Sequence, residues 1–319
     1  MRRILFASVL IILAGAGCST APAARPSPDR RAAIPSAVSK IEPAQDQYPP
    51  QLHSNEWEKP IPLPGPINTA GAEDSPFVTA DGKEFYFFFT PDPNVPPERQ
   101  LFDGVTGIWR STRTENGWAE PERVWLAPPG KEALDGCEFV SGETIWFCSA
   151  RAGNYRDIDL YIAKRRGAGW AEAKNAGELL NKTFEVGEMH LAADEKTLYF
   201  HSPRAGGNGK LDIWTTGRDG DTWKEPVNLE AVNTAEDEGW PALSPDGNEL
   251  WFLRTYRGAP AIFRSKRGTD GNWSKPELIV SSFAGEPSLD SEGNLYFTHH
   301  YFRDGKMLEA DIYFAKRKR

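Results

Sequence analysis

Five similar segments of the sequence each carry a glutamate close to the point where an apolar run begins. These glutamates are Glu73, Glu138, Glu188, Glu238 and Glu286. The same or neighbouring segments also contain Arg151, His190, Arg204 and Trp240. Carboxyl groups gathered at one place can act as acid and base in cleaving a glycosidic bond, or can pair with arginine in a solvated network. The elements that position them decide between these two chemistries.

Other catalytic patterns are missing from the sequence. It contains neither the G-x-S-x-G elbow of α/β-hydrolases nor the H-E-x-x-H of zinc proteases. Asp157 and Asp159 form a D-x-D pair, but no loop has the D-x-D-x-D-G spacing of a calcium ligand set. We therefore predict no metal and no cofactor, and we expect Asp159, Asp212 and Asp311 to cap turns or accept backbone hydrogen bonds.

The acidic segments belong to a repeat. "EDSPFVTADGKEFYFFF" from 73 matches "DEGWPALSPDGNELWFLR" from 237, and three shorter versions lie between and after them. A further apolar strand follows each copy, as "GIWRSTR", "DLYIAKR", "DIWTTGR", "AIFRSKR" and "DIYFAKR". Period-2 patterns separated by turn signals such as "ADGK" and "PDGN" are typical of antiparallel strands. Five copies of one supersecondary unit are present.

A tryptophan opens a fourth element after four of the five copies, but the fifth copy stops at Arg319. The four are Trp118, Trp170, Trp223 and Trp273, and the missing one is Trp57 in "NEWEKPIPL" near the other end. The tryptophans recur in register, so we expect them to pack between neighbouring outer strands. We predict a five-bladed β-propeller over residues 54–319, closed by an N-terminal strand that completes the last blade. A β-sandwich is the alternative, and it gives the early tryptophan element no role.

The motifs "SPDGNELWF", "SPRAGG" and "DIW" are similar to those of the WD40-like repeats of TolB-type bacterial envelope propellers. The resemblance covers residues 55–319 and implies a scaffold that binds an envelope protein or cell-wall glycan. In a four-stranded blade, the loops between strands two and three share one face with the loops between blades. We expect the nine residues named in the first paragraph to form a ligand-binding surface on that face, around the channel mouth. A glycoside hydrolase is the alternative, although regular repetition of the glutamates speaks against catalysis.

The chain begins with an export signal. Arg2 and Arg3 precede an apolar run from Ile4 to Leu13, which is too short to span a bilayer. The "GAGC" that follows resembles a bacterial lipobox, with Gly15 where leucine is usual, and implies a signal over 1–18 and a lipid on Cys18. Ser19 after the cysteine implies the periplasmic side of the outer membrane. An ordinary secretory signal with nearby cleavage is the alternative.

Residues 19–53 are rich in proline, alanine and polar residues and have no regular apolar period. We predict a disordered tether for this segment. Loss of Arg2 and Arg3 with the signal changes the formal charge from −8 to −10. A chain this acidic is a poor candidate for binding nucleic acid or anionic lipid.

Two cysteines remain in the folded part, at either end of the hairpin "CEFVSGETIWFC". A two-residue turn at Gly142 and Glu143 would place Cys137 directly opposite Cys148. Opposed Cα atoms in an antiparallel pair lie within the range that a disulfide spans, and exported proteins meet an oxidising compartment. We predict a Cys137–Cys148 disulfide, with two buried free thiols as the alternative.

Overall fold

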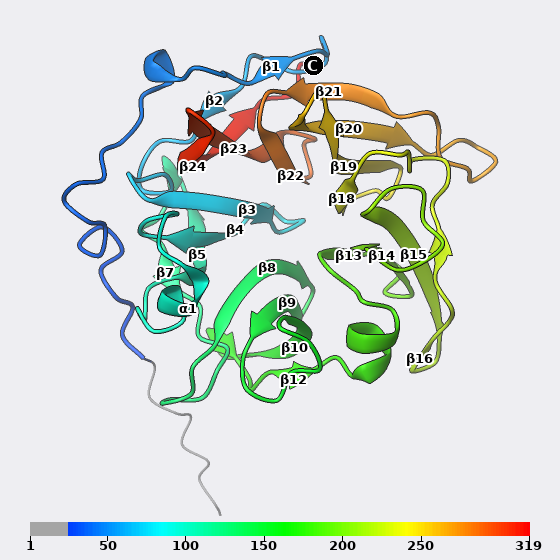
Figure 1. Ribbon diagram of the computed structural model, residues 1–319, viewed down its shortest axis with the longest axis horizontal. Helices are drawn as coiled ribbons and strands as arrows, with labels where there is room; N and C mark the ends of the chain where they lie inside the picture. The colour runs from blue at the N-terminus through cyan, green and yellow to red at the C-terminus, as the bar shows by residue number, and fades with distance from the viewer. Residues whose placement is uncertain (1–24) are drawn as a thin grey trace, which may run out of the picture.

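The computed structural model describes residues 25–319. The predicted signal segment 1–18 and its Cys18 lie outside these residues. Five blades of antiparallel strands stand around a central axis, and the chain passes through them in order around the ring (Figure 1). A parallel pairing of Ala310 with Ala72 joins the last and first blades into one sheet. No helix in residues 25–319 is long and apolar enough to cross a membrane. The protein is a five-bladed β-propeller, as the repeats predict.

Each blade begins with an inner strand at the channel and continues outward through a second and a third strand. The inner strands are β3 Ala72–Val78, β8 Leu134–Ser141, β13 Met189–Leu191, β18 Glu238–Leu243 and β22 Ala284–Leu289. The second strands are β4 Glu84–Thr90, β9 Thr144–Ala150, β14 Thr197–Ser202, β19 Glu249–Tyr256 and β23 Leu295–Arg303. The third strands are β5 Gly107–Thr114, β10 Asp159–Arg166, β15 Asp212–Asp219, β20 Ala259–Lys266 and β24 Lys306–Ala315.

The outer strands are short and interrupted. In the first three blades they are the pairs β6 Gly117–Trp118 with β7 Glu122–Arg123, β11 Gly169–Trp170 with β12 Lys174–Asn175, and β16 Thr222–Trp223 with β17 Val227–Asn228. The fourth blade has β21 Glu277–Ser281, extended by β1 Gln51–Leu52. The fifth has β2 Ile61–Pro62. The short helix α1 Pro97–Gln100, the 3₁₀ turn η1 Pro43–Gln45 and the π-helical turn η2 Leu179–Thr183 lie in connecting segments.

Ring closure follows the prediction from the early tryptophan element. Ile61 and Pro62 pair with Phe314 and Tyr313 of the last third strand, and Trp57 forms a β-bridge with Arg317. The first and last parts of the chain therefore share one blade. Pairing along β24 removes a sheet edge that would otherwise be open.

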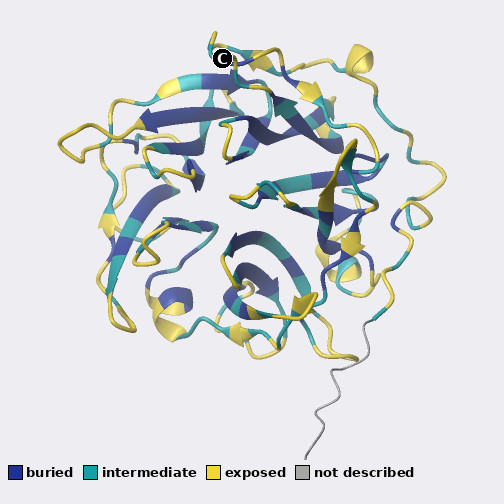
Figure 2. Ribbon diagram, turned by 180° about the vertical axis from the view of Figure 1, so that it is seen from behind, coloured by how far each residue is buried: buried dark blue, intermediate teal, exposed yellow. Residues whose placement is uncertain are grey.

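The second strands are buried on both faces because each blade is covered by its two neighbours (Figure 2). Phe85, Tyr86 and Phe87 of β4, for example, are all fully buried. This explains why the second strands are almost continuously apolar rather than alternating.

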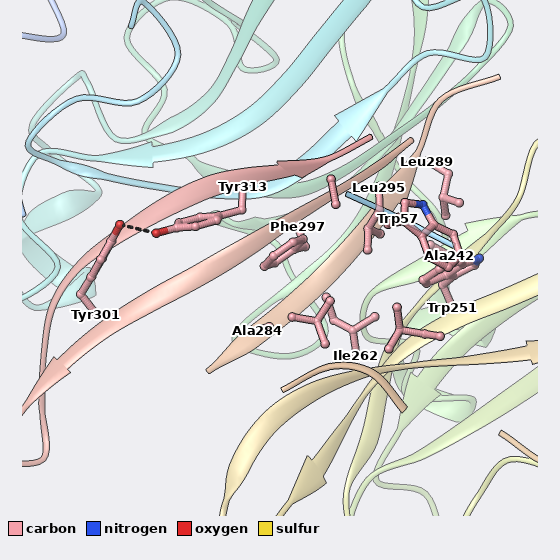
Figure 3. Packing of buried hydrophobic residues seen from close by; sticks show 13 residues of the cluster. Trp57, Ala242, Trp251, Ile262, Ala284, Leu289, Leu295, Phe297, Tyr301 and Tyr313 are labelled. Carbon is pink, nitrogen blue, oxygen red and sulfur yellow. Dashed lines mark hydrogen bonds between the residues drawn. The ribbon is translucent and has the colours of Figure 1, made fainter. Parts of the chain in front are cut away.

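The repeated tryptophans pack between blades, as predicted, although their partners are on second strands. Trp57 lies edge-on against Trp251 of the preceding blade, with ring centroids 5.3 Å apart (Figure 3). Trp223 and Trp273 meet Trp146 and Tyr199 of their preceding blades edge-on as well, and Trp170 meets Tyr86 at a tilt of 56°. An arginine of each blade's own third strand, or of the residues just after it, lies over its tryptophan as a cation–π partner; these are Arg113, Arg165, Arg218, Arg267 and Arg317.

Residues 25–53 correct the prediction of a disordered tether. They form an ordered segment, here called the N-terminal strap, that runs along the periphery of the ring before reaching β1 (Figure 1). Arg30 of the strap is 2 % exposed and pairs with Glu73 at 3.2 Å. Lys40 pairs with Asp311, and Asp46 bonds to His299 at 2.8 Å. These polar anchors, rather than apolar periodicity, hold the strap in place.

Two of the three aspartates, Asp159 and Asp212, accept the backbone hydrogen bonds that we predicted. Asp159 accepts hydrogen bonds from the backbone N–H groups of Tyr155 and Arg156, at 2.8 and 3.2 Å. Asp212 accepts from the backbone of Asn208 and Gly209. Asp311 differs, because its partners are the side chains of Lys40 and Tyr301.

Candidate functional site: an acidic pocket in the central channel

Four of the five inner strands are bulged, and the bulges decide which side chains face the channel. The register of the first hairpin of the blade shifts between Asp74 and Phe77, and comparable shifts occur in the second, fourth and fifth blades. One residue in each bulge has a left-handed backbone conformation, with φ between 50° and 56°: Ser75, Cys137, Trp240 and Glu286. A bulge turns a side chain away from the alternation of the strand, so these residues do not follow a simple in-and-out pattern.

A pocket of about 890 Å³ occupies the channel. All five inner strands contribute to its lining, as do the turns between first and second strands, including Asp81, Glu143 and Pro245. Neither Arg151 nor Arg204 lines it. The pocket therefore lies toward the turns between first and second strands, which is the opposite end of the channel from the face that we predicted.

Four carboxyl groups and one thiol come together in the channel and are here called the channel cluster: Asp74, Cys137, Glu138, Glu188 and Glu286. All except Asp74 line the pocket. The four acids come from the inner-strand segments of four blades. None of the ion pairs found among residues 25–319 involves them.

Glu138 is the member of the cluster without partners. Its side chain is 5 % exposed, and neither carboxylate oxygen has a hydrogen-bond donor among the described residues. Register places Glu138 just before Phe139, which faces Trp146 of the second strand. The corresponding residues of the other blades are Pro76, Met189, Pro241 and Pro287. One blade thus carries an acid at a position that is otherwise apolar.

Glu188 and Glu286 do have donors. The Cys137 thiol donates to Glu188 Oε1 at 3.1 Å. Glu286 Oε2 accepts from the backbone N–H of Ser75 at 2.6 Å and from Thr298 Oγ1 at 2.8 Å. The Cys137–Glu188 contact joins the second and third blades, and the Glu286–Ser75 contact joins the fifth and first blades. The cluster therefore also links adjacent blades.

Burial and mutual repulsion raise the pKa values of three of the acids, Asp74, Glu138 and Glu188. Burial raises the pKa of Glu138 well above its usual range, and the charges of Asp74, Glu188 and Glu286 raise it further. Burial and the charge of Glu286 also raise the pKa of Glu188 and of Asp74 well above their usual ranges. The hydrogen bond with Cys148, together with burial, raises the pKa of the Cys137 thiol. The environments of Asp74, Glu138 and Glu188 therefore favour the neutral carboxyl form, and a nearby positive charge would oppose that preference.

His190 lies near the cluster but supplies no positive charge. Its ring packs against Phe139 at a tilt of 47°, with centroids 4.3 Å apart, and burial lowers its pKa to about 3. Within residues 25–319 no three acidic, histidine or cysteine side chains converge closely enough to hold a metal ion.

The five predicted glutamates do not share one environment, and only Glu138, Glu188 and Glu286 line the pocket. Glu73 and Glu238 occupy a different strand position and are fully buried. Glu73 accepts from the backbone N–H and hydroxyl of Thr69 and pairs with Arg30, while Glu238 bonds to Thr234 and to Arg254 at 2.6 Å. Repetition of the residue type concealed this difference, because the bulges and the varying spacing before them offset the glutamates from one another.

Arg151 and Arg204 are structural in their contacts. Arg151 bonds to Asp135 at 2.5 Å and lies over Tyr161. Arg204 pairs with Glu225 and lies over Phe184 and Trp214. Neither reaches the pocket.

Trp240 also lies outside the pocket lining. Its backbone N–H donates to His201 Nδ1 at 3.2 Å, and the two rings are 4.9 Å apart. Of the nine predicted residues, Glu138, Glu188, His190 and Glu286 line the pocket.

The cysteine hairpin has the predicted turn and an unpredicted register. Ser141 faces Thr144, but the bulge after Gly136 places Cys148 opposite Gly136 instead of Cys137. Both cysteines are free thiols in the structure. The predicted direct opposition is wrong, and the disulfide itself stays a prediction.

Sequence reasoning missed Asp74 and Cys137 as members of the cluster. Asp74 could have been found by aligning the repeats, because the other four blades have glycine at its position. These glycines are Gly136, Gly187, Gly239 and Gly285. At Gly285 a Cβ would come within 2.7 Å of the Leu253 side chain, which shows how closely the neighbouring blade approaches there. Departures from the repeat, rather than the repeat itself, mark the cluster.

No protein-family model and no curated protein sequence matches the chain. Among solved structures, one described as "putative TolB" from Agrobacterium tumefaciens is similar, with a TM-score of 0.46 and 16 % identity over 78 % of this chain and 90 % of that one. An endo-arabinase from Bacteroides thetaiotaomicron has a TM-score of 0.48 and 13 % identity over 77 % and 94 %. An α-L-arabinofuranosidase from Lactobacillus brevis has a TM-score of 0.49 and 14 % identity over 79 % and 92 %. At such identities the likeness concerns the propeller fold alone.

Proposed function

We propose that this chain is a non-enzymatic binding propeller of the bacterial envelope, of the TolB-like type, which recognises a protein segment or a cell-wall fragment in its central pocket. The observation that carries the proposal is Glu138, a buried acid without a partner that lines a pocket of about 890 Å³. An unpaired buried polar group costs free energy, so a protein that retains one has a use for it. Pockets of this size accommodate a small molecule or a few side chains of a larger partner.

We also propose that the protein is attached by a lipid on Cys18 to the periplasmic side of the outer membrane. The lipobox-like "GAGC" and the following Ser19 support this placement. A propeller held in this way would present its pocket to other envelope proteins or to the cell wall.

The binding test uses the pocket itself. Immobilised wild-type protein is exposed to purified cell-wall fragments and, separately, to envelope proteins, and the retained species are identified by mass spectrometry. We expect retention that Glu138→Gln and Glu188→Gln weaken while thermal unfolding shows both variants folded. Retention that is equal on the wild type and both variants would place the binding surface elsewhere and refute the pocket.

A glycoside hydrolase is the second candidate, and one observation favours it. Glu138 is buried with a raised pKa, as a general acid requires, while Glu286 in the same pocket accepts two hydrogen bonds, as suits a carboxylate. A screen on polysaccharides and cell-wall glycans decides between the two. Turnover by the wild type that Glu138→Gln abolishes would establish the hydrolase and overturn the non-enzymatic proposal.

A further inference from the structure

We infer that the central pocket binds a primary ammonium group carried on an aliphatic stem, as in a lysine side chain, with Glu138 as its main partner. The inference rests on the proposed binding function and specifies the chemistry of the ligand. It starts from the charge of the site. Four acidic side chains share the channel, and none of them forms an ion pair with a described residue.

Glu138 shows that the acids are not simply a solvated network. It is more than nine-tenths buried, lines the pocket and receives no hydrogen bond from residues 25–319 at either oxygen. Elsewhere the same fold neutralises buried acids with cations, as it does for Glu73 with Arg30 and for Glu238 with Arg254. A cation from outside the chain would do for Glu138 what these arginines do for their partners.

The positions of the acids on separate blades favour an ammonium group over a metal ion or a guanidinium group. They approach from separate blades, and the described residues offer no convergent set for a metal ion. A guanidinium group presents its donors in one plane and suits a single carboxylate, whereas an ammonium group has three donors that can point to several acceptors. Glu138, Glu188 and Glu286 together provide such acceptors around one pocket.

The walls suit the stem of such a ligand. Next to the acids, the pocket is lined by apolar side chains: Pro76, Phe139, Met189, Pro241 and Pro287. Methylene groups of a lysine side chain gain free energy by lying against such surfaces while the charged end reaches a polar group. The pocket rim carries both basic and acidic side chains, so it has no excess of positive charge that would repel a cationic ligand. They are Lys83, Arg113, Arg165, Asp81, Glu84 and Glu143.

The protonation of the cluster fits a site that exchanges protons for a cation. Burial favours the neutral form of Glu138 by raising its pKa, and an approaching ammonium group would favour the ionised form, so we expect binding to release a proton. The titratable groups that surround Glu138 are Asp74, Cys137, Glu188, His190 and Glu286. The pKa values of Asp74, Glu188 and Cys137 are also raised, so the released proton can come from any of these groups as well as from Glu138.

The test compares two probes of equal shape. Isothermal titration calorimetry measures binding of Nα-acetyl-lysine methylamide and of Nα-acetyl-norleucine methylamide, which lacks only the ammonium group. We expect the lysine probe to bind at least about tenfold more tightly, because charge-assisted hydrogen bonds are among the stronger ones in proteins. Proton release, read from buffers of different ionisation enthalpy, should accompany binding of the lysine probe alone.

Two variants locate the effect. Glu138→Gln removes the unpartnered acid, and Glu143→Gln removes an equal charge from the pocket rim, where the side chain is 77 % exposed. We expect Glu138→Gln to weaken the lysine probe at least about tenfold and Glu143→Gln to leave it within about twofold. Glu188→Gln serves as a second pocket variant if Glu138→Gln does not fold.

The outcomes separate this inference from the proposed function. Equal binding of the two probes, or equal losses in Glu138→Gln and Glu143→Gln, overturns the ammonium site. If cell-wall fragments or envelope proteins bind the pocket and acetylation of their amines changes nothing, the proposed function stands and the inference fails. If acetylation abolishes binding of wall fragments alone or of proteins alone, the inference stands and the source of the amine is identified.

Discussion

Arg30 of the strap pairs with a buried acid and lies over aromatic rings in the first blade. In the second and fourth blades, an arginine of the blade itself has this position. In the second blade Arg151 pairs with Asp135 and lies over Phe147 and Tyr161. In the fourth blade Arg254 pairs with Glu238 and lies over the equivalent Phe252 and Phe263. The first blade has Thr90 in this region of its second strand, and Arg30 arrives from the strap to pair with Glu73 over Phe87 and Trp109.

We predict that Arg30→Ala lowers the free energy of unfolding by about 3–5 kcal/mol, because it leaves the buried Glu73 without its charge partner and empties an aromatic slot. The neighbouring variant Arg31→Ala is the control, since Arg31 is 55 % exposed and forms only a surface pair with Glu120. Its cost should stay below about 1 kcal/mol. Urea unfolding of the three proteins measures both values, and similar costs for the two variants would contradict a structural role for the strap.

This residue could not be found from sequence periodicity. Arg30 lies in a proline- and alanine-rich segment with no repeat, so nothing links it to the blade that it completes. The signal was indirect: the arginine of "FCSAR" and "SPRAGG" has no counterpart in the first blade's "FFFTPD". Lys40 fills the fifth blade in a related way, lying over Tyr301 and pairing with Asp311.

At the scale of elements, the closing strand depends on one side chain more than on its backbone pairing. Strand β2 has only two residues, and its Ile61 is 57 % exposed. Trp57, four residues earlier, is fully buried, donates from Nε1 to the Gly293 carbonyl at 3.0 Å and packs on Trp251. Arg264 and Arg317 lie over its ring.

Trp57→Ala should therefore destabilise the protein by about 3–5 kcal/mol, the usual cost of removing a large buried aromatic side chain. Ile61→Ala, in the same segment, should cost less than about 1 kcal/mol because its side chain is already exposed. Thermal and urea unfolding compare the two. A cost for Trp57→Ala no greater than that for Ile61→Ala would mean that the last blade is stable without its N-terminal strand.

Strand order and closure were predictable because tryptophan, turn and third-strand signals recur in every blade. The bulges were not, since four different residue types, Ser75, Cys137, Trp240 and Glu286, adopt the same left-handed conformation. None of them is glycine, the residue type that would have indicated a left-handed conformation in the sequence. The predicted alignment of the glutamates failed for this reason, and so did the predicted opposition of Cys137 and Cys148.

For the whole molecule, the channel cluster makes stability depend on pH. Asp74, Glu138 and Glu188 have raised pKa values in the folded protein, so above the ordinary carboxyl pKa the folded state retains protons that the unfolded state has lost. Stability must then fall as pH rises. Histidines act in the opposite sense at lower pH: burial lowers the pKa of His190 to about 3 and that of His201 to about 4, against 6.5 unfolded. Below pH 6.5 the contribution of these two histidines to stability therefore falls as pH decreases, whereas the buried acids act in the opposite direction.

We accordingly predict that the free energy of unfolding of the ligand-free protein decreases between pH 7 and pH 8, by up to about 1.4 kcal/mol per pH unit for each proton that the folded state retains. Glu138→Gln removes one such proton and should flatten this slope, whereas Glu143→Gln, at an exposed site, should leave it unchanged. Urea unfolding at half-unit pH steps measures the slopes. A slope that is flat or rising in the wild type, or that is the same in Glu138→Gln, would mean that the buried acids are already ionised and paired in the folded channel.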